Sequence, residues 1–426
     1  MASFDSLAVD VVLHPSVSLV DRRPTLSASI CANATIASIP LSCTLSAQAL
    51  MTNVPAFAAF ESFGSGISDD DVLCFFIVNV LTRETDELSL FASRYIAFIN
   101  NFPKSYDSPV FLPPDSQASK LLAHTTVGAL TSRLQQQMDA DHGRLSALLG
   151  QFIDMHPEHE EALPSVEAFT FEAYVTALFS VYSRGADIEL CVVGSAGGER
   201  RRLLIPVLDM FNHNANCAVS HGLNAETLTV DISTVTSLPA GECCLNYGAL
   251  PNQRLLLFYG FTVDNNAADF AELYVPLAEG MPFVERKAAV MRACFPEFVP
   301  NTSVKILVGG EIPAVLMSLL RLLGVSEENE MATAERRAVV GEGVPMQSQD
   351  NEGGALGALE NALASMSQAI AVDLLSEEKE DEGEREELVD FVRVYVESEL
   401  QILSECLSRC RERIEELRGK CIDGCD

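Results

Sequence analysis

The sequence has no apolar run long enough to cross a membrane, which takes about 18 residues. Its first residues, M-A-S-F-D-S-L-A-V-D-V-V, include acids and no arginine before Arg22, and they lack the basic flank and long apolar core of a secretory signal. We therefore expect no transit peptide, no signal peptide and no membrane contact. The twelve cysteines are then expected to be free thiols in a reducing compartment, the cytoplasm or the nucleus.

Basic residues are also scarce, with 28 Lys and Arg against 60 Asp and Glu, which gives a net charge of −32. This balance argues against direct nucleic-acid binding, because that needs a basic surface, and it favours a protein partner with basic residues. Part of the charge is local, since the acidic run at 377–387 is typical of a solvated loop. The 426 residues, of which 48% are apolar, predict two or three units with proper cores.

The stretch 203–261 holds the densest set of polar motifs. Its apolar run Leu203–Leu208 predicts a buried strand or a short buried helix, and Asp209 follows directly. Asn212 and His213 come next, where the run emerges and where residues that contact ligands tend to lie. The motif therefore predicts a binding site at the end of a buried element.

The second half of this stretch contains two Tyr-Gly pairs. A turn at Pro239-Ala240-Gly241 precedes Glu242–Tyr247, a short run that is apolar enough to predict a strand. Gly248 follows Tyr247, and the second pair is Tyr259-Gly260, followed by Phe261.

Three ordered motifs, D-x-x-N-H, G-E-x-x-x-x-Y-G and N-x-x-L-L-x-x-Y-G-F, resemble those of the SET-domain methyltransferases. They are most similar to the branch that includes the Rubisco large-subunit lysine methyltransferase and the actin histidine methyltransferase. The resemblance implies an S-adenosyl-L-methionine-dependent protein methyltransferase and covers nearly all of the chain. It is weakest at residues 1–35 and 324–354.

The resemblance also implies roles for single residues. Tyr247 corresponds to the catalytic tyrosine, Asn212 and the main chain of His213 to the residues that hold adenine, and Arg184 to an arginine near cofactor and substrate amine. Donor binding is assigned to eight positions, which are Thr25, Leu26, Arg184, Asp209, Asn212, His213, Tyr247 and Phe261. Substrate contact is assigned to three, which are Arg184, Tyr259 and Phe261.

The N-terminal motif departs from the family pattern G-x-G-L-x-A. Leu26 matches, but Arg23 and Thr25 stand where the family has glycines that let the main chain approach the methyl donor. Asn33 stands at a later glycine, which is a mild change because asparagine tolerates a positive φ. The departure raises the question whether the donor still binds.

The resemblance implies an α+β fold in which a helical insert interrupts the SET β-fold and an all-α domain follows. We expect the N-terminal SET part at 1–67, the insert at 68–164, the catalytic SET part at 165–280 and a helical substrate-binding domain at 281–426. Within the last domain, 324–354 has few large apolar residues and predicts a loose insertion. Glycines at 194–198 predict a hairpin loop.

Apolar spacing predicts the helices. The expected segments are 72–81 capped by the acids at 69–71, 88–99, 135–149, 169–182, 312–323, 356–375 and 387–420. Six residues of the last segment, Leu400, Leu403, Leu407, Cys410, Ile414 and Leu417, step by three and four. This apolar seam favours packing on its own domain, with a coiled coil as the alternative.

Three groups of residues raise the question of a metal. His213, Cys217 and His221 are spaced by four, but the neighbouring asparagines disfavour a helix and the family gives His213 another role. The run His156–Glu161 is not H-E-x-x-H, and Pro157 breaks helical spacing, which favours a solvated loop. The C-terminal group, Cys406, Cys410, Cys421 and Cys425, lacks a C-x-x-C pair. We predict no metal site.

Methyl transfer from a sulfonium to an amine is an in-line displacement that needs alignment and a neutral amine. A tyrosine hydroxyl such as that of Tyr247 accepts from polarised methyl hydrogens and stays protonated near neutral pH, and no dedicated base is required. We predict lysine methylation by a monomer. The alternatives are histidine methylation, or a SET scaffold that has lost its donor site and binds a partner.

Overall fold

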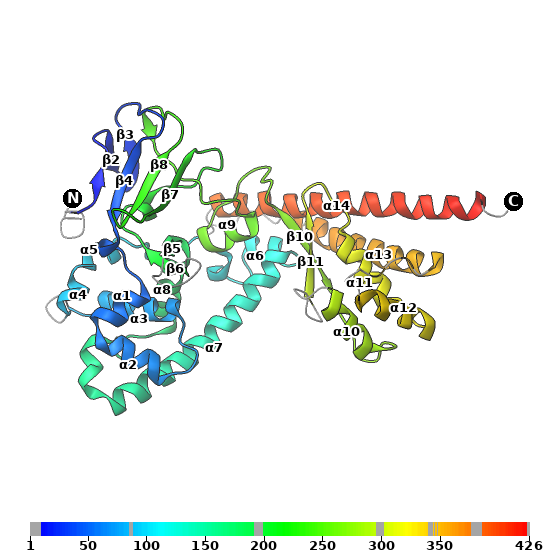
Figure 1. The fold of residues 1–426 in the computed structure, drawn as a ribbon, viewed down its shortest axis with the longest axis horizontal. Coiled ribbons are helices and arrows are strands. Elements are labelled where there is room, and N and C mark those ends of the chain that lie inside the picture. The colour runs from blue at the N-terminus through cyan, green and yellow to red at the C-terminus, as the bar shows by residue number, and fades with distance from the viewer. Residues whose placement is uncertain are drawn as a thin grey trace. The chain divides into compact units, whose positions relative to one another are not determined.

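The computed structural model describes residues 10–84, 88–190, 199–294, 302–339, 344, 346, 348–375 and 386–423. The chain forms two compact units, each built from two separate segments (Figure 1). The first combines residues 1–106 with 134–249, and the second combines 107–133 with 250–426. Part of the predicted insert, 107–133, and the end of the predicted catalytic part, 250–280, thus belong to the second unit.

The described residues of the first unit form three antiparallel sheets. Their strand orders are β1-β4-β8-β7, β2-β3-β9 and β5-β6. The strands are β1 (Val12–Leu13), β2 (Val17–Val20), β3 (Arg23–Leu26), β4 (Thr35–Pro40), β5 (Gly185–Leu190), β6 (Glu199–Leu204), β7 (Val219–Asn224), β8 (Thr229–Thr234) and β9 (Gly241–Glu242). In β8 the side chains of Val230, Ile232 and Thr234 are buried and their neighbours are not, as expected for a strand with one face on a core.

Helices pack beside these sheets around an aromatic core. They are α1 (Ala47–Asn53), α2 (Pro55–Phe63), α3 (Asp69–Thr82), α4 (Leu90–Ser93), α5 (Ile96–Ile99), α8 (Phe171–Arg184) and the part of α7 (Thr126–Met155) from residue 134 onward. Phe75 of α3 stacks on Phe169, just before α8, with ring centroids 4.4 Å apart. Phe60 contacts both Phe75 and Phe152 at 4.9 and 5.2 Å. Burying each of these rings contributes about 2–3 kcal/mol.

Several helix boundaries differ from the sequence prediction for local reasons. Helix α3 is capped by Ser68, not by the acids alone, because Ser68 and Asp71 exchange hydrogen bonds in a capping box. The single helix expected at 88–99 is two short helices, α4 and α5. The expected loop at 156–161 contains a 3-10 helix, Pro157–Ala162, because proline suits the first turn of a helix.

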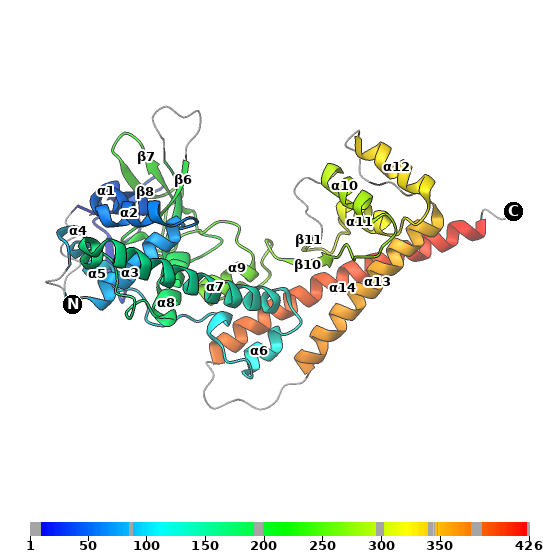
Figure 2. The same cartoon turned by 90° about the horizontal axis from the view of Figure 1, so that it is seen from below.

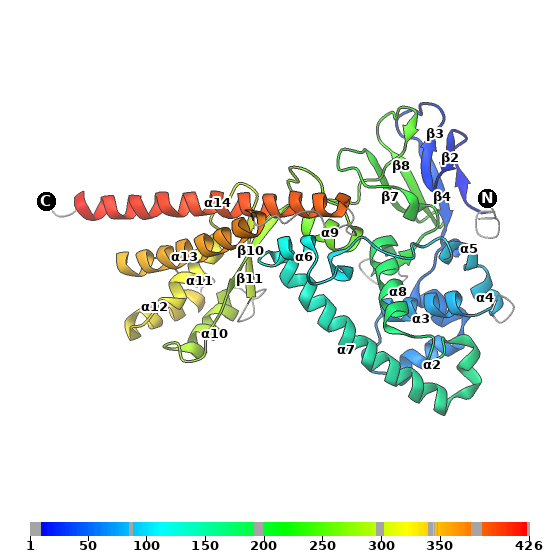
Figure 3. The ribbon, with the colours of Figure 1, turned by 180° about the vertical axis from the view of Figure 1, so that it is seen from behind.

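The second unit is mainly helical (Figure 2). Its elements are α6 (Gln117–Leu122), α9 (Asn252–Tyr259), β10 (Phe270–Val275), α10 (Val284–Cys294), β11 (Thr302–Leu307), α11 (Ala314–Leu323), α12 (Glu328–Val339), α13 (Gln349–Leu375) and α14 (Glu386–Asp423). Helices α13 and α14 run side by side (Figure 3). The C-terminal part is not all-α, because β11 pairs antiparallel with β10.

The prediction of a loose insertion at 324–354 is wrong, because this segment contains α12 and the start of α13. Small and flexible apolar residues hold α12 in place, since Met331, Ala334 and Ala338 are buried in the core of the unit. Glu352 of α13 forms a buried ion pair with Arg321, with Nε and Oε2 2.5 Å apart. Large apolar residues were therefore a poor guide to order in this segment.

The apolar seam of α14 packs on its own unit, as predicted. Leu403 and Cys410 are buried in the core of that unit, and Leu400, Leu407, Ile414 and Leu417 pack against it. The glycines at 194–198, most of the acidic run 377–387 and Cys425 lie outside the described residues. None of the helices in the described parts of the chain is long and apolar enough to span a membrane.

Glu399 of α14 caps the N-terminus of α7 from within the second unit. Its carboxylate accepts hydrogen bonds from the Thr126 N–H, 3.1 Å from each oxygen, from the Thr126 hydroxyl and from the Tyr395 hydroxyl at 2.5 Å. Glu399 is 1% exposed, and burial raises the pKa of its carboxyl, which the hydrogen bonds oppose. A buried acid therefore satisfies donors that a helix leaves open at its N-terminus.

Candidate functional site

The site begins where strand β6 ends. The apolar run continues buried through Ile205, but proline at 206 offers no N–H, and Val207 has a positive φ of 73°. A β-branched residue in that region is strained, and such strain persists where the surrounding structure enforces it, often at functional sites. The chain then forms a 3-10 helix, Leu208–Met210, that carries Asp209. The predicted buried strand is therefore correct only as far as Leu204.

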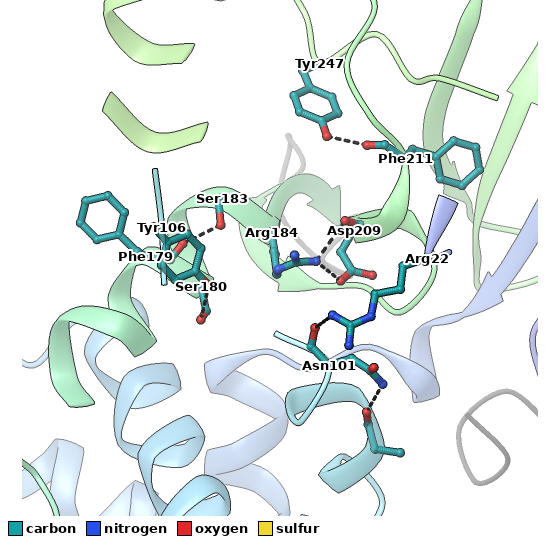
Figure 4. Close-up of polar contacts among 11 residues, drawn as sticks. Arg22, Asn101, Tyr106, Phe179, Ser180, Ser183, Arg184, Asp209, Phe211 and Tyr247 are labelled. Carbon is teal, nitrogen blue, oxygen red and sulfur yellow. Dashed lines mark hydrogen bonds and ion pairs between the residues drawn. The ribbon is translucent and has the colours of Figure 1, made fainter. Parts of the chain in front are cut away.

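Arg184, the last residue of α8, forms an ion pair with Asp209 (Figure 4). Its Nη1 lies 2.7 Å from Oδ2 and 3.2 Å from the main-chain oxygen of Asp209. The Asp209 side chain is 3% exposed, and burial raises the pKa of its carboxyl, while the Arg184 guanidinium lowers it. The guanidinium also lies over the ring of Phe102, 5.5 Å from the centroid. The structure thus joins two predicted donor-site residues.

Tyr106 belongs to this cluster and was missed from the sequence. Its hydroxyl lies 2.7 Å from the Ser180 hydroxyl, one turn before Arg184 on α8 (Figure 4). Burial raises the pKa of Tyr106, and contacts with Ser180 and Arg184 oppose the rise. No motif marked this residue, because it lies in the loop after Phe102 and not in a periodic element.

The segments around His213 and Leu245 pair in parallel at an isolated β-bridge. The Leu245 N–H donates to the Asn212 carbonyl at 2.8 Å, and the Asn214 N–H donates to the Leu245 carbonyl at 3.1 Å. This parallel bridge directs the main-chain groups of His213 to the other side of the segment. The prediction of a strand at Glu242–Tyr247 is wrong. Strand β9 covers only Gly241–Glu242, and the isolated bridge at Leu245 is the only β-pairing in the rest of that segment.

Tyr247 is fixed at both its main chain and its hydroxyl. Its N–H donates to Nδ1 of His213 at 3.1 Å. Its hydroxyl donates to the Phe211 carbonyl at 2.5 Å (Figure 4). Burial lowers the pKa of His213, which keeps its ring neutral and able to accept. Gly248 follows with φ 100°, a conformation that glycine adopts without strain. The predicted catalytic tyrosine and adenine-site histidine are therefore direct neighbours.

The N-terminal strand lies beside this cluster. In the register of β3 and β9, Leu26 is opposite Gly241 and Thr25 is opposite Glu242. Glu242 accepts a hydrogen bond from the Asn212 side-chain amide at 2.6 Å, and its carboxylate lies 3.8 Å from Nη1 of Arg23. Thr25 and Leu26 thus lie on the strand that pairs with β9, and the Glu242 side chain joins Asn212 to that strand.

The residues with a positive φ in this region are not those at the positions of the first two family glycines, 23 and 25. Arg23 and Thr25 lie in the extended strand β3, whereas Asp21 and Arg22 have φ values of 48° and 64° in the two-residue turn before it. Asn33 has φ 59°, which confirms the prediction that asparagine replaces glycine there. Positions 23 and 25 therefore need no glycine for backbone reasons.

Tyr259 and Phe261 lie in the second unit, at the C-terminal end of α9. Their rings contact edge to face, with centroids 6.3 Å apart. Gly260 between them has φ 75°, and a Cβ there would lie 2.0 Å from the Asp107 carbonyl oxygen. The glycine of this motif is thus required by both conformation and space.

Among the residues that the structure describes, no three His, Cys, Asp or Glu side chains are placed to hold a metal ion. His213 accepts from Tyr247, and the Cys217 thiol donates to the Cys244 carbonyl at 2.9 Å. Cys406 and Cys410 are buried in the core of the second unit.

Comparisons with solved structures define the class of fold. The SET domain of LSMT bound to lysine and AdoHcy superposes with a TM-score of 0.75 at 17% identity, covering 97% of this chain and 91% of that chain. Rubisco LSMT bound to AdoMet gives a TM-score of 0.70 at 17% identity, covering 97% and 92%. The protein therefore has the SET-domain fold, as its motifs predicted. No protein-family model matches the chain.

Sequence relatives add a more particular likeness. The actin-histidine N-methyltransferase of Danio rerio is 28% identical over 241 residues, 56% of this chain and 38% of the relative. The protein of the same name from Homo sapiens is 28% identical over 235 residues, 54% of this chain and 37% of the relative. The matched region thus spans less than two fifths of the length of these relatives.

Proposed function

We propose that the protein is an S-adenosyl-L-methionine-dependent protein methyltransferase. The observation that carries the proposal is the arrangement of Tyr247, whose main chain is bound to His213 and whose hydroxyl donates to the Phe211 carbonyl. Asn212 lies in the same segment, and Arg184 and Asp209 are joined just before it. This arrangement occurs in a SET-domain fold, and solved structures of that fold contain AdoMet or AdoHcy.

The residues fit a methyl donor with polar groups. Two buried polar atoms, Nε of Arg184 and Oδ1 of Asp209, have no hydrogen-bond partner among the described residues. Asn212 is exposed, so its amide is accessible once it leaves Glu242. Asn212 and the main chain of His213 would hold adenine, and Thr25 and Leu26 would lie at the same donor site.

When bound, the donor would supply a methyl group on a sulfonium, and the neutral thioether would be the leaving group of an in-line displacement. The Tyr247 hydroxyl donates a hydrogen bond to the Phe211 carbonyl, which orients the lone pairs of the hydroxyl oxygen. These lone pairs can accept polarised methyl C–H groups. A tyrosine phenol is in general protonated near neutral pH and is therefore a weak nucleophile. The protein thereby contributes alignment and a fixed acceptor, which lower the barrier without a covalent step.

The target nitrogen is a lysine side chain in our proposal. The solved neighbour bound to lysine supports this assignment, and the name of the sequence relatives supports histidine as the alternative. A lysine must lose its proton before it attacks, and an apolar environment around the amine would favour its neutral form. A histidine has one neutral ring nitrogen near pH 7 and needs less help.

The first test is calorimetric titration of the full chain with S-adenosylmethionine and S-adenosylhomocysteine. Saturable binding is the expected result, and absence of binding at millimolar donor would reject the enzyme and favour the partner-binding scaffold. The second test incubates the protein with lysates and tritiated donor, then locates the label by mass spectrometry. A label on lysine supports our assignment, and a label on histidine replaces it.

We propose that residues 281–426 select a protein substrate with a basic surface. The net charge of −32 supports complementary attraction, which speeds encounter with a basic partner. Three exposed acids on α14, Glu412, Glu415 and Glu416, allow a test by triple substitution to lysine. Target binding is expected to weaken while donor affinity stays unchanged. Loss of donor affinity with retained target binding would contradict this division of roles.

A matched control reverses three exposed acids of the first unit, Asp139, Asp154 and Glu172. The control changes net charge equally and leaves α14 intact. If both triple variants weaken target binding alike, the effect comes from overall charge and not from the C-terminal helix.

A further inference from the structure

Three thiols lie together beside the residues assigned to the donor site, and the proposed mechanism uses none of them. The Cys217 thiol donates to the Cys244 carbonyl at 2.9 Å, and Cys243 precedes Cys244 in the chain. Burial raises the pKa of Cys243 and Cys244, and the charge of an ionised Cys217 raises both further. Because such a charge effect needs a nearby sulfur, the three thiols form one cluster.

The main chain holds the two thiol-bearing segments against each other. The Asn214 N–H donates to the Leu245 carbonyl at 3.1 Å, and the Asn246 N–H donates to the Val219 carbonyl at 3.2 Å. Cys217 lies between Asn214 and Val219 in its own segment, so hydrogen bonds flank it on both sides. The neighbourhood of its thiol is therefore fixed by the fold and not by a mobile side chain alone.

The Cys217 sulfur is close enough to Cys244 for a disulfide. A carbonyl oxygen lies about 2.4 Å from the Cα atom of its own residue, so the thiol–carbonyl contact places this sulfur at most about 5.3 Å from the Cys244 Cα. In a disulfide the two Cα atoms are about 4.4–6.8 Å apart. Rotation about the Cα–Cβ bonds, with a shift of the main chain, can then join the two sulfurs.

Exposure selects Cys217 and Cys244 from the cluster. Both residues are half-buried, whereas Cys243 is 2% exposed. Burial, together with Cys217 and Cys244, raises the pKa of Cys243 to about 12, so this thiol is poorly ionised at neutral pH. The thiolate is the nucleophilic form of cysteine. Cys243 is therefore poorly suited to oxidation by an agent from solvent.

Packing explains part of this arrangement. A thiol that donates to a carbonyl is satisfied, and a cysteine often serves as a small apolar residue of a protein interior. Packing does not require, however, that the accepting carbonyl belong to a second half-buried cysteine. It also does not require that this second cysteine lie in the segment that leads to Tyr247.

We propose that Cys217 and Cys244 form a reversible disulfide in the presence of hydrogen peroxide, and that this bond lowers the affinity of the donor site. The Cys217 thiolate attacks one peroxide oxygen and the O–O bond breaks, which gives a sulfenic acid and hydroxide. The Cys244 sulfur then attacks the sulfenic sulfur, so that an S–S bond forms and the S–O bond breaks. The released oxygen leaves as water with the Cys244 proton, and hydroxide takes up the proton that Cys217 lost. Two thiols and one peroxide thus give one disulfide and two waters.

The position of the disulfide connects it to the donor site, and this step rests on the proposed function. Directly after Cys244, the Leu245 N–H donates to the Asn212 carbonyl at 2.8 Å, and Tyr247 follows two residues later. Disulfide formation breaks the hydrogen bond from Cys217 and moves the main chain beside this contact. The groups assigned to adenine and to the methyl group are then displaced from each other.

The first measurement maps the bond. The reduced full chain is treated with a slight molar excess of hydrogen peroxide, free thiols are blocked, and the protein is digested without reduction. Cleavage after glutamate separates the cysteines, because Glu226 and Glu242 lie between Cys217 and the pair Cys243-Cys244. Mass spectrometry with fragment ions is expected to show Cys217 joined to Cys244, and dithiothreitol is expected to release the two peptides.

The second measurement follows the donor site. Calorimetry with S-adenosylhomocysteine compares the reduced, the oxidised and the re-reduced protein. Affinity should fall at least about tenfold on oxidation and recover after dithiothreitol. Recovery distinguishes a disulfide from oxidation to sulfinic or sulfonic acid, which dithiothreitol does not reverse.

Variants assign the effect to the pair. Cys217→Ser keeps a donor for the Cys244 carbonyl and removes one sulfur, and Cys244→Ser removes the other. Both should bind S-adenosylhomocysteine as the reduced wild type does and should keep that affinity after peroxide. The controls Cys243→Ala and Cys31→Ser, the latter at an exposed position, should remain sensitive to peroxide.

Three results would overturn the proposal. The first is oxidised protein without a bond between Cys217 and Cys244, including protein that joins Cys243 instead. The second is a mapped bond that leaves donor affinity unchanged. The third is an equal loss of affinity in Cys217→Ser, which would place the oxidation at another residue. Reduced protein that binds no donor would reject the proposed function and the effect on the donor site with it, and the mapped bond alone would then decide whether the disulfide forms.

Discussion

Arg184 and Asp209 connect the end of α8 to the 3-10 turn before Asn212 through a 2.7 Å ion pair whose acidic partner is 3% exposed. Removing one partner of a buried pair leaves an uncompensated charge and costs about 3–5 kcal/mol. We expect Asp209→Ala to lower the free energy of unfolding by that amount in urea titrations without donor. Glu199→Ala, which removes an exposed partner of Arg201, is the control and should cost at most about 1 kcal/mol. Equal losses would show that the Arg184 pair is only a surface contact.

Tyr247→Phe separates catalysis from folding. The substitution removes the hydroxyl that donates to Phe211 and leaves the main-chain contact with His213. We expect donor affinity to change little and the methylation rate to fall at least about tenfold, or about 1.4 kcal/mol in barrier height. Single-turnover assays with radiolabelled donor measure this. Tyr274→Phe, on an exposed position of β10, is the control, and wild-type turnover by the Tyr247 variant would remove it from the mechanism.

Asn212→Ala tests adenine recognition. Loss of its side-chain amide should weaken S-adenosylhomocysteine binding by about 1–3 kcal/mol, because the groups it would pair with remain buried. Calorimetry measures the change, and Asn216→Ala in the same loop, also exposed, serves as the control. If Asn212→Ala binds donor as the wild type does, this residue has no role in the site.

Arg23→Gly restores the glycine that the family pattern has at this position. Since Arg23 is 62% exposed and lies 3.8 Å from Glu242, losing the pair should cost at most about 1 kcal/mol of stability. The glycine gives the donor more room beside β3. It also removes Arg23, which shares the Glu242 carboxylate with the Asn212 amide. We expect severalfold tighter S-adenosylhomocysteine binding. Weaker binding by a folded variant would show that Arg23 itself contacts the donor.

Glu399→Gln tests the buried cap of α7 by its pH dependence. Because burial raises the pKa of Glu399, the folded state holds the proton more tightly than the unfolded state does. This contribution to stability is complete below the ordinary glutamate pKa of about 4.3 and is lost as pH rises through the raised pKa.

Glutamine lacks this titration. The unfolding free energy of the wild type minus that of Glu399→Gln should therefore decrease as pH rises from 5 to 8 in denaturant titrations. Glu397→Gln, exposed on the same helix, should follow the wild type at every pH. A constant difference for Glu399→Gln would mean that its carboxyl titrates alike in both states.

Much of the site was predictable because its motifs encode backbone needs that only a few residues meet. Gly260 adopts a positive φ against the Asp107 carbonyl, and Gly248 does so after Tyr247. Asn33 was predictable for the same reason. Such requirements are local, so spacing along the chain reveals them.

The failures came where side chains replaced regular main-chain pairing. The strand expected at Glu242–Tyr247 stops early, because Asn246 donates to the Ala215 carbonyl and accepts from the Gly248 N–H, while the His213 ring accepts from Tyr247. Tyr106 and the Arg184 pair with Asp209 depend on segments far apart in sequence, which periodicity does not reveal. In 324–354, small alanines formed a helix where large apolar residues were lacking.

Each unit is built from two segments that are separated in the sequence by a segment of the other unit, and this order affects folding during synthesis on the ribosome. The first unit is complete only when residue 249 has emerged, and until then residues 107–133 must wait for partners that lie beyond residue 250. The apolar residues of α6, which the second unit later buries, are therefore exposed for the time that more than a hundred residues take to translate. Chaperone dependence of nascent chains, and aggregation of any fragment that stops near residue 249, follow from this connectivity.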